Sequence, residues 1–103
     1  MNLEKYRKER KRLFDKQPYN RESDNLMYAS NSLGEVGELQ NVVKKIYRDC
    51  DGYINEKHLA EMIHEGGDVL WYLFMFFEDI LGVKIDDVFE ANIIKLKERY
   101  KVE

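Results

Sequence analysis

Apolar residues recur along this chain at intervals of three and four residues, the spacing that places side chains on one face of an α-helix. The pattern predicts four helices, over residues 2–15, 23–48, 56–81 and 86–100. No segment alternates apolar and polar residues as a half-buried strand does, so the predicted fold class is all-α. The side chains expected to face the core of the last three helices are Leu26, Ala29, Leu33, Val36, Val43 and Tyr47; Leu59, Ile63, Leu70, Leu73, Phe77 and Ile80; and Val88, Phe89, Leu96 and Tyr100.

Turn and capping residues separate these helices. Pro18 disfavours helix at the residue before it and so ends the first helix. Residues 49–53 (DCDGY) predict a turn, and Asn55 is suited to cap the third helix. Gly82 is expected to end that helix and Asp86 to cap the fourth.

The third helix is apolar nearly all round from Val69 onward. Such a helix needs cover on more than one side, and a second subunit is its simplest source. At 103 residues the chain is one domain. We therefore expect an antiparallel bundle of about four helices, completed by dimerisation, with a variable basic N-terminal helix and turn over residues 1–22 and a catalytic core over residues 23–100.

Charge and composition narrow the function. The net charge is −3, so nucleic acid is an unlikely partner. Basic residues are frequent in the first 16 positions, and we interpret them as a solvated helix face. With Cys50 as its single cysteine, the chain can form neither an internal disulfide nor a Cys-rich zinc site. It has no apolar run long enough to span a membrane and no apolar segment near its start, so we expect a cytoplasmic protein.

Two acidic pairs stand out within the predicted helices. Glu35 and Glu38 on the second helix, and Glu65 and Asp68 on the third, are each three residues apart and so share a helix face. If the two helices pack antiparallel about the turn near Gly52, Glu38 lies 14 residues before it and Glu65 lies 13 after it, so the pairs meet. Ionised carboxylates beside a core are costly unless they are paired or coordinated.

Glycines accompany both acidic pairs. Gly37 lies beside Glu38, and Gly66 and Gly67 lie between Glu65 and Asp68. Each glycine inside a helix costs about 1 kcal/mol relative to alanine. We therefore expect another helix or a ligand to approach the backbone closely there, so that leucine at position 66 or 67 would push the two helices apart.

Four carboxylates without a cluster of histidine or cysteine point to a hard cation, with Mg²⁺ favoured. Mg²⁺ usually takes substrate phosphates as further ligands, which favours a phosphate ester or anhydride as substrate. Cations for such a substrate could come from one face of the fourth helix or from the second helix, and Trp71 could stack on a base or pack in the core. The residues concerned are Asn92, Lys95 and Arg99, and Lys44 and Lys45.

These motifs together resemble a known family. Residues 33–39 (LGEVGEL), 43–45 (VKK), 65–73 (EGGDVLWYL), 81–83 (LGV) and 92–100 (NIIKLKERY) look like those of the MazG-like nucleotide pyrophosphohydrolases, the all-α NTP pyrophosphatase superfamily. The resemblance covers residues 26 to 100. It implies Mg²⁺-dependent hydrolysis of an NTP or dNTP to the monophosphate and pyrophosphate, by a homodimer or homotetramer, and Mn²⁺ could substitute for Mg²⁺.

The resemblance also implies roles for single residues. Glu35, Glu38, Glu65 and Asp68 would be the catalytic metal ligands, and one of these carboxylates would orient or deprotonate the attacking water. Lys95 and Arg99 would hold the phosphates with the help of Asn92, and Lys45 and Trp71 are further candidates for substrate binding.

Two other functions stay open. Glu61 and His64 form a Glu-x-x-His motif of the kind that di-iron bundles use, although such a site needs two copies. Alternatively, the protein is a non-enzymatic helical interaction or nucleic-acid-binding module that uses the basic N-terminus. In that case substitution of Arg10 and Arg12 would weaken a salt-sensitive complex.

Overall fold

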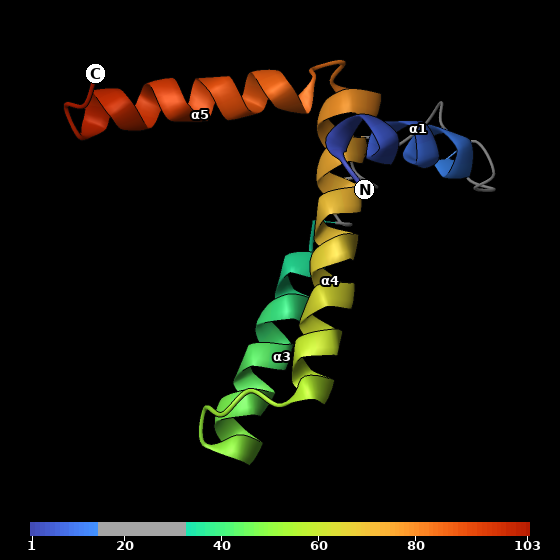
Figure 1. The fold of residues 1–103 in the computed structure, drawn as a ribbon, viewed down its shortest axis with the longest axis vertical. Helices are drawn as coiled ribbons and strands as arrows, with labels where there is room; N and C mark the ends of the chain where they lie inside the picture. The colour runs from blue at the N-terminus through green and yellow to red at the C-terminus, as the bar shows by residue number, and fades with distance from the viewer. Residues whose placement is uncertain (15–32) are drawn as a thin grey trace.

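The computed structural model describes residues 1–14 and 33–103, which form five helical segments and no strand (Figure 1). The all-α prediction is confirmed. The helices expected over residues 2–15, 56–81 and 86–100 are present, whereas residues 23–32 of the expected second helix lie outside the described residues. The segments are α1 (Leu3–Phe14), α3 (Glu35–Cys50), α4 (Glu56–Phe74), the π-helix η1 (Met75–Ile80) and α5 (Ile85–Arg99).

An antiparallel hairpin of α3 and α4 is the centre of the fold (Figure 1). Its connection is the predicted turn, where Asp51 and Gly52 have positive φ angles of 51° and 83°. The predicted cap is also present, because the Asn55 side chain accepts a 2.8 Å hydrogen bond from the backbone N–H of His58. A left-handed turn followed by a capped helix start fixes the register of the two helices.

The buried face of α3 differs from the predicted one. Val42 and Ile46 are buried, whereas Val36, Val43 and Tyr47 are exposed. Successive residues of a helix are about 100° apart, so the two apolar stripes are neighbours, and α4 covers only the stripe of Val42 and Ile46. The same holds on α4 and α5, where further residues that were expected to be buried are exposed: Leu59, Ile63, Leu70, Phe89 and Tyr100.

The third predicted helix changes its winding near its end. From Met75 it continues as a π-helix, and the Leu81 N–H donates to the Phe76 carbonyl at 3.1 Å, five residues back. Within this stretch the adjacent side chains of Phe74 and Met75 are both buried, 4% and 1% exposed. Gly82 ends the stretch with a φ of 69°, as predicted.

The cap of α5 was predicted wrongly. The helix begins at Ile85 after Lys84, so Asp86 lies inside the first turn and is not the cap. The Ile85 N–H donates instead to the Glu78 Oε2 atom at 2.9 Å. An acceptor from η1 therefore satisfies a free N–H group at the start of α5, and Asp86 is available for another contact.

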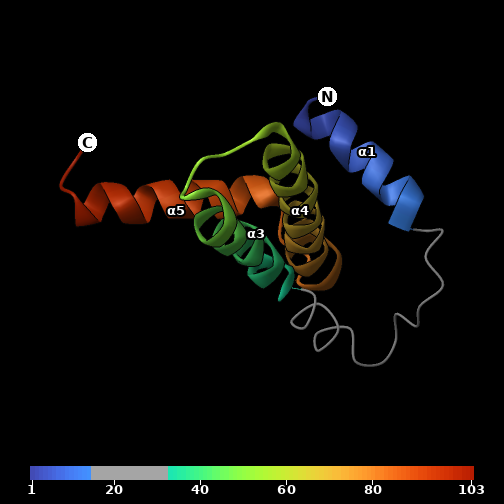
Figure 2. The same cartoon turned by 90° about the horizontal axis from the view of Figure 1, so that it is seen from below.

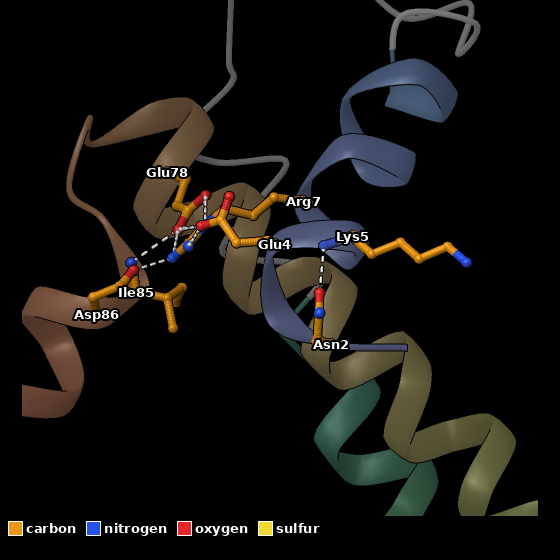
Figure 3. Close-up of polar contacts among 7 residues, drawn as sticks. All are labelled: Asn2, Glu4, Lys5, Arg7, Glu78, Ile85 and Asp86. Carbon is orange, nitrogen blue, oxygen red and sulfur yellow. Dashed lines mark hydrogen bonds and ion pairs between the residues drawn. The ribbon is translucent and has the colours of Figure 1, made fainter.

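Arginine side chains of α1 attach that helix to the rest of the chain. Arg7 pairs with both Glu78, at 3.0 Å, and Asp86, so that α1, η1 and the start of α5 meet at one guanidinium (Figure 3). Arg10 is 3% exposed; it pairs with Asp79 at 2.9 Å and lies over the Trp71 ring, 4.7 Å from its centroid. The basic N-terminus is therefore only partly a solvated face, because Arg7 and Arg10 make tertiary contacts.

One chain does not close into a compact bundle. In both views α5 projects away from the α3–α4 hairpin (Figures 1 and 2). The radius of gyration is 16.7 Å, whereas a compact domain of this size has about 13 Å. Phe89, Ile93 and Tyr100 lie on one face of α5 and are 50% or more exposed. A large part of the apolar surface is therefore uncovered in the single chain.

Because its hydrogen bond with Arg7 lowers the pKa of Asp86 below the ordinary value of 3.8, this contact should make stability depend on pH. A lowered pKa in the folded state stabilises the fold above about pH 4, and the contribution is lost as pH falls below that value. We expect Asp86→Asn to lower the melting temperature at pH 7 and to have less effect near pH 3, as measured by circular dichroism.

Asp87→Asn is the matched control. Asp87 is also in the first turn of α5 but has no ion pair with a residue of the described ranges. If both variants lose the same stability with the same pH profile, the helix dipole and not the Arg7 contact is responsible.

Candidate metal centre

Three carboxylates from the two hairpin helices converge at one place. Glu35 is the first residue of α3, and Glu65 and Asp68 are one turn apart in the middle of α4. One carboxylate oxygen from each lies within 4.8 Å of the other two. The hairpin register predicted from the turn thus brings the two acidic pairs to the same level, as expected.

The fourth acid lies beside this trio. Glu38 is one turn further along α3 and lines a groove together with Glu65. Burial raises the pKa of Glu35, and the negative charges of Asp68, Glu65 and Glu38 raise it further. The other three carboxylates therefore act electrostatically on Glu35, and a bound cation would relieve this repulsion.

The geometry of the trio fits a hard divalent cation. Mg²⁺ holds its oxygen ligands at about 2.0–2.1 Å, so ligands on opposite sides of the ion are about 4.2 Å apart. The 4.8 Å limit on the three oxygens is only slightly larger. Carboxylate oxygens are also the donors that Mg²⁺ prefers.

A groove of about 500 Å³ continues from the acids along the hairpin toward the turn. Its cations come from α3, and its wall on α4 includes the Glu-x-x-His motif. Glu61 and His64 share this groove with three positive side chains and lie outside the carboxylate trio, and a di-iron site would need a second copy of the motif. The lining residues are Glu38, Asn41, Val42, Lys44, Lys45, Arg48, Glu61, His64 and Glu65.

Aromatic residues and α1 lie on the side of the four acids that is away from the groove. Trp71 is three residues beyond Asp68 on α4, and the Arg10 guanidinium covers one face of its ring. Burial raises the pKa of Tyr6, and the charge of Asp68 raises it further while that of Arg10 lowers it. Tyr6 and Arg10 thus belong to the surroundings of Asp68. Sequence reasoning missed them, because no local pattern links α1 to α4.

The α5 candidates are not brought to the acids within one chain. Asn92, Lys95 and Arg99 are all exposed, and α5 leads away from the hairpin in both views (Figures 1 and 2). They belong neither to the trio of Glu35, Glu65 and Asp68 nor to the lining of the groove. Their assignment as phosphate ligands stays a prediction.

The glycines do not serve close packing of the two helices, so this prediction was wrong. A Cβ atom added at Gly37, Gly66 or Gly67 would have no described neighbour within 4 Å. The α3–α4 contact instead uses the face of Val42 and Ile46, and the glycines lie beside that contact. Within residues 1–14 and 33–103, the space beside these glycines is open.

An all-α hairpin that brings acidic side chains from two helices into one cluster could hold a metal ion through carboxylates. Residues 24–102 match the family model of the MazG nucleotide pyrophosphohydrolase domain, and the chain belongs to this family. The matched range contains all four acids as well as α3, α4 and α5.

A curated relative is the Gene 37 protein of Mycobacterium phage L5. It is 39% identical over 77 residues, which cover 74% of this chain and 67% of the relative. No solved structure matches the chain. Among the described residues, no helix is long and apolar enough to cross a membrane.

The open space beside Gly67 predicts a gain in stability. Gly67→Ala should raise the free energy of unfolding of the metal-free protein by about 1 kcal/mol, because alanine restricts the unfolded chain and meets no neighbour among the described residues. Urea unfolding followed by circular dichroism would measure the change. A loss of stability would show that something, such as a second chain, lies against this position.

Proposed function

We propose that the protein is a Mg²⁺-dependent nucleoside triphosphate pyrophosphohydrolase, which converts an NTP or dNTP and water to the monophosphate and pyrophosphate. The observation that carries this proposal is the trio of carboxylate oxygens within 4.8 Å, formed by family-matched residues of two helices. The name of the phage relative states no activity, so the substrate is inferred from the family and the site together.

Each acid has a proposed role. Glu35, Glu65 and Asp68 hold the cation, which when bound would polarise a phosphoryl oxygen of the substrate. Glu38 is the acid outside the trio, so we assign it the orientation and deprotonation of the attacking water. The water oxygen forms a bond to the α-phosphorus, the bond from that phosphorus to the bridging oxygen breaks, and pyrophosphate leaves with the bond electrons.

We also propose that the working enzyme is a homo-oligomer. Phe89, Ile93 and Tyr100 form an exposed apolar stripe on α5, with Lys95 and Arg99 on the same helix. A monomer rarely leaves such a stripe in water. A second chain that covers it would also bring the α5 cations toward a set of acids, as the family resemblance requires.

Sedimentation tests the oligomer. We expect the parent protein to sediment as a dimer or larger at micromolar concentration and Ile93→Asp to sediment as a monomer, because a charge on the stripe would be buried at the interface. Ala91→Asp places the same charge on the opposite, exposed face of α5 and should leave the oligomer intact. A monomeric parent protein would contradict the proposal.

The catalytic proposal is tested with a panel of NTPs and dNTPs in Mg²⁺, with chromatography of the products. Monophosphate and pyrophosphate should form in equal amounts, and chelation should stop the reaction. Asp68→Asn and Glu38→Gln should each lower kcat/KM by about a hundredfold or more, since each removes a charged group from the reacting centre. Glu98→Gln, on the exposed surface of α5, is the control.

Thermal unfolding distinguishes the residues that hold the cation from Glu38, which is proposed to activate the water. Mg²⁺ should raise the melting temperature of the parent protein and of Glu38→Gln, but have less effect on Asp68→Asn. Release of inorganic phosphate instead of pyrophosphate, or full activity of Asp68→Asn, would rule out the proposed reaction.

A further inference from the structure

The groove beside the acids contains cations that the hydrolytic centre itself does not need. Lys44, Lys45 and Arg48 lie along α3 beyond Glu38, and His64 faces them from α4. From Glu38 to Arg48 the helix makes almost three turns, about 15 Å. The groove is therefore long enough for more than one phosphate group.

Among the described residues, these cations have weak ion-pair partners or none. Neither Lys44 nor Lys45 forms an ion pair with a residue of the described ranges. Arg48 pairs with its neighbour Asp49 at 2.8 Å, but both side chains are more than half exposed. Exposed pairs are worth little, so Arg48 can exchange this partner for a phosphate oxygen.

Among the described residues, the side of the acids away from the groove offers no comparable free positive charge. Arg7 is held by Glu78 and Asp86, and Arg10 is buried against Trp71 and pairs with Asp79. That side presents the aromatic rings of Trp71 and Tyr6 near Asp68. The trio thus lies between the basic groove and a region of the hairpin that carries aromatic side chains and is covered by α1.

We infer that the groove is the subsite for the leaving pyrophosphate, with Lys44, Lys45, Arg48 and His64 as its donors. The α-phosphorus then lies at the acids, and the nucleoside extends toward Trp71. The inference rests on the proposed function and adds to it the direction in which the substrate lies. Because Glu38, Glu61 and Glu65 also line the groove, pyrophosphate should bind well only when Mg²⁺ offsets their charge.

The test measures binding of pyrophosphate and of a nucleoside monophosphate to the full chain by calorimetry, with and without Mg²⁺. Pyrophosphate should bind in Mg²⁺, and the double variant Lys44→Gln/Arg48→Gln should weaken this binding about tenfold or more, because two charge-assisted hydrogen-bond donors are lost. Binding of the monophosphate should change less than twofold, or about 0.4 kcal/mol.

Two controls accompany this measurement. Lys57→Gln removes a positive charge from an exposed position of α4 outside the groove and should change neither affinity. Lys44→Arg/Arg48→Lys keeps both charges and should retain most of the pyrophosphate affinity, which shows that the loss in the first variant is not a folding defect.

The outcomes separate the two proposals. Unchanged pyrophosphate affinity in Lys44→Gln/Arg48→Gln, or an equal loss for pyrophosphate and monophosphate, overturns the groove assignment even in an active enzyme. Selective loss of Mg²⁺-dependent pyrophosphate binding supports it. A parent protein that cleaves no nucleotide refutes the proposed function instead, and its pyrophosphate binding would still decide whether the groove is an anion site.

Discussion

The register of the α3–α4 hairpin is the constraint on which the rest of the site depends. Asp51 and Gly52 supply two consecutive residues of positive φ, and the Asn55 cap starts α4 three residues later. The two helices must then run back along each other with little freedom to slide. This places Glu35 against Glu65 and Asp68, although their mutual repulsion opposes the arrangement. Apolar contact through Val42 and Ile46 holds the acids together against that repulsion, which is how a fold can keep a cation site ready before the cation arrives.

A second set of charged side chains connects the helices at the end of the molecule away from the α3–α4 turn. Arg7 contacts Glu78 and Asp86, while Glu78 also accepts the N–H of Ile85, so a single carboxylate links α1, η1 and α5. Charge-assisted hydrogen bonds that share partners in this way restrict geometry more than separate surface pairs do. Polar contacts therefore help to fix the direction in which α5 leaves η1, together with the buried side chain of Ile85. Such a helix can present its apolar stripe to a second chain in a defined orientation.

Features that depend on residues close together in the chain were predicted correctly from the sequence. Features that depend on contacts between distant segments were not. The turn at Gly52, the Asn55 cap and the equal spacing of the acids about the turn were readable, because each involves residues that are close along the chain. The buried face of α3 was not, since periodicity reveals apolar stripes but not which stripe a neighbour covers. Similarly, Arg7 and Glu78 are 71 residues apart, and no spacing rule connects them. The prediction of the α5 cap failed for the same reason, because the acceptor for the Ile85 N–H comes from another helix.

The wrong prediction for the glycines shows which contact they do not serve. Gly66 and Gly67 were expected to let α3 approach, yet no described atom would meet a Cβ at either position. Glycine still weakens a helix interior, so we expect the space it leaves to serve another contact, such as one with a second chain. Successive residues of a helix are about 100° apart, so Gly66 and Gly67 lie mainly on the side of α4 away from Glu65 and Asp68. If the pyrophosphate occupies the basic groove at Lys44 and Arg48, the sugar and base extend from Asp68 toward Trp71. Side chains at positions 66 and 67 would then disturb a contact with a second chain and not the contact between α3 and α4.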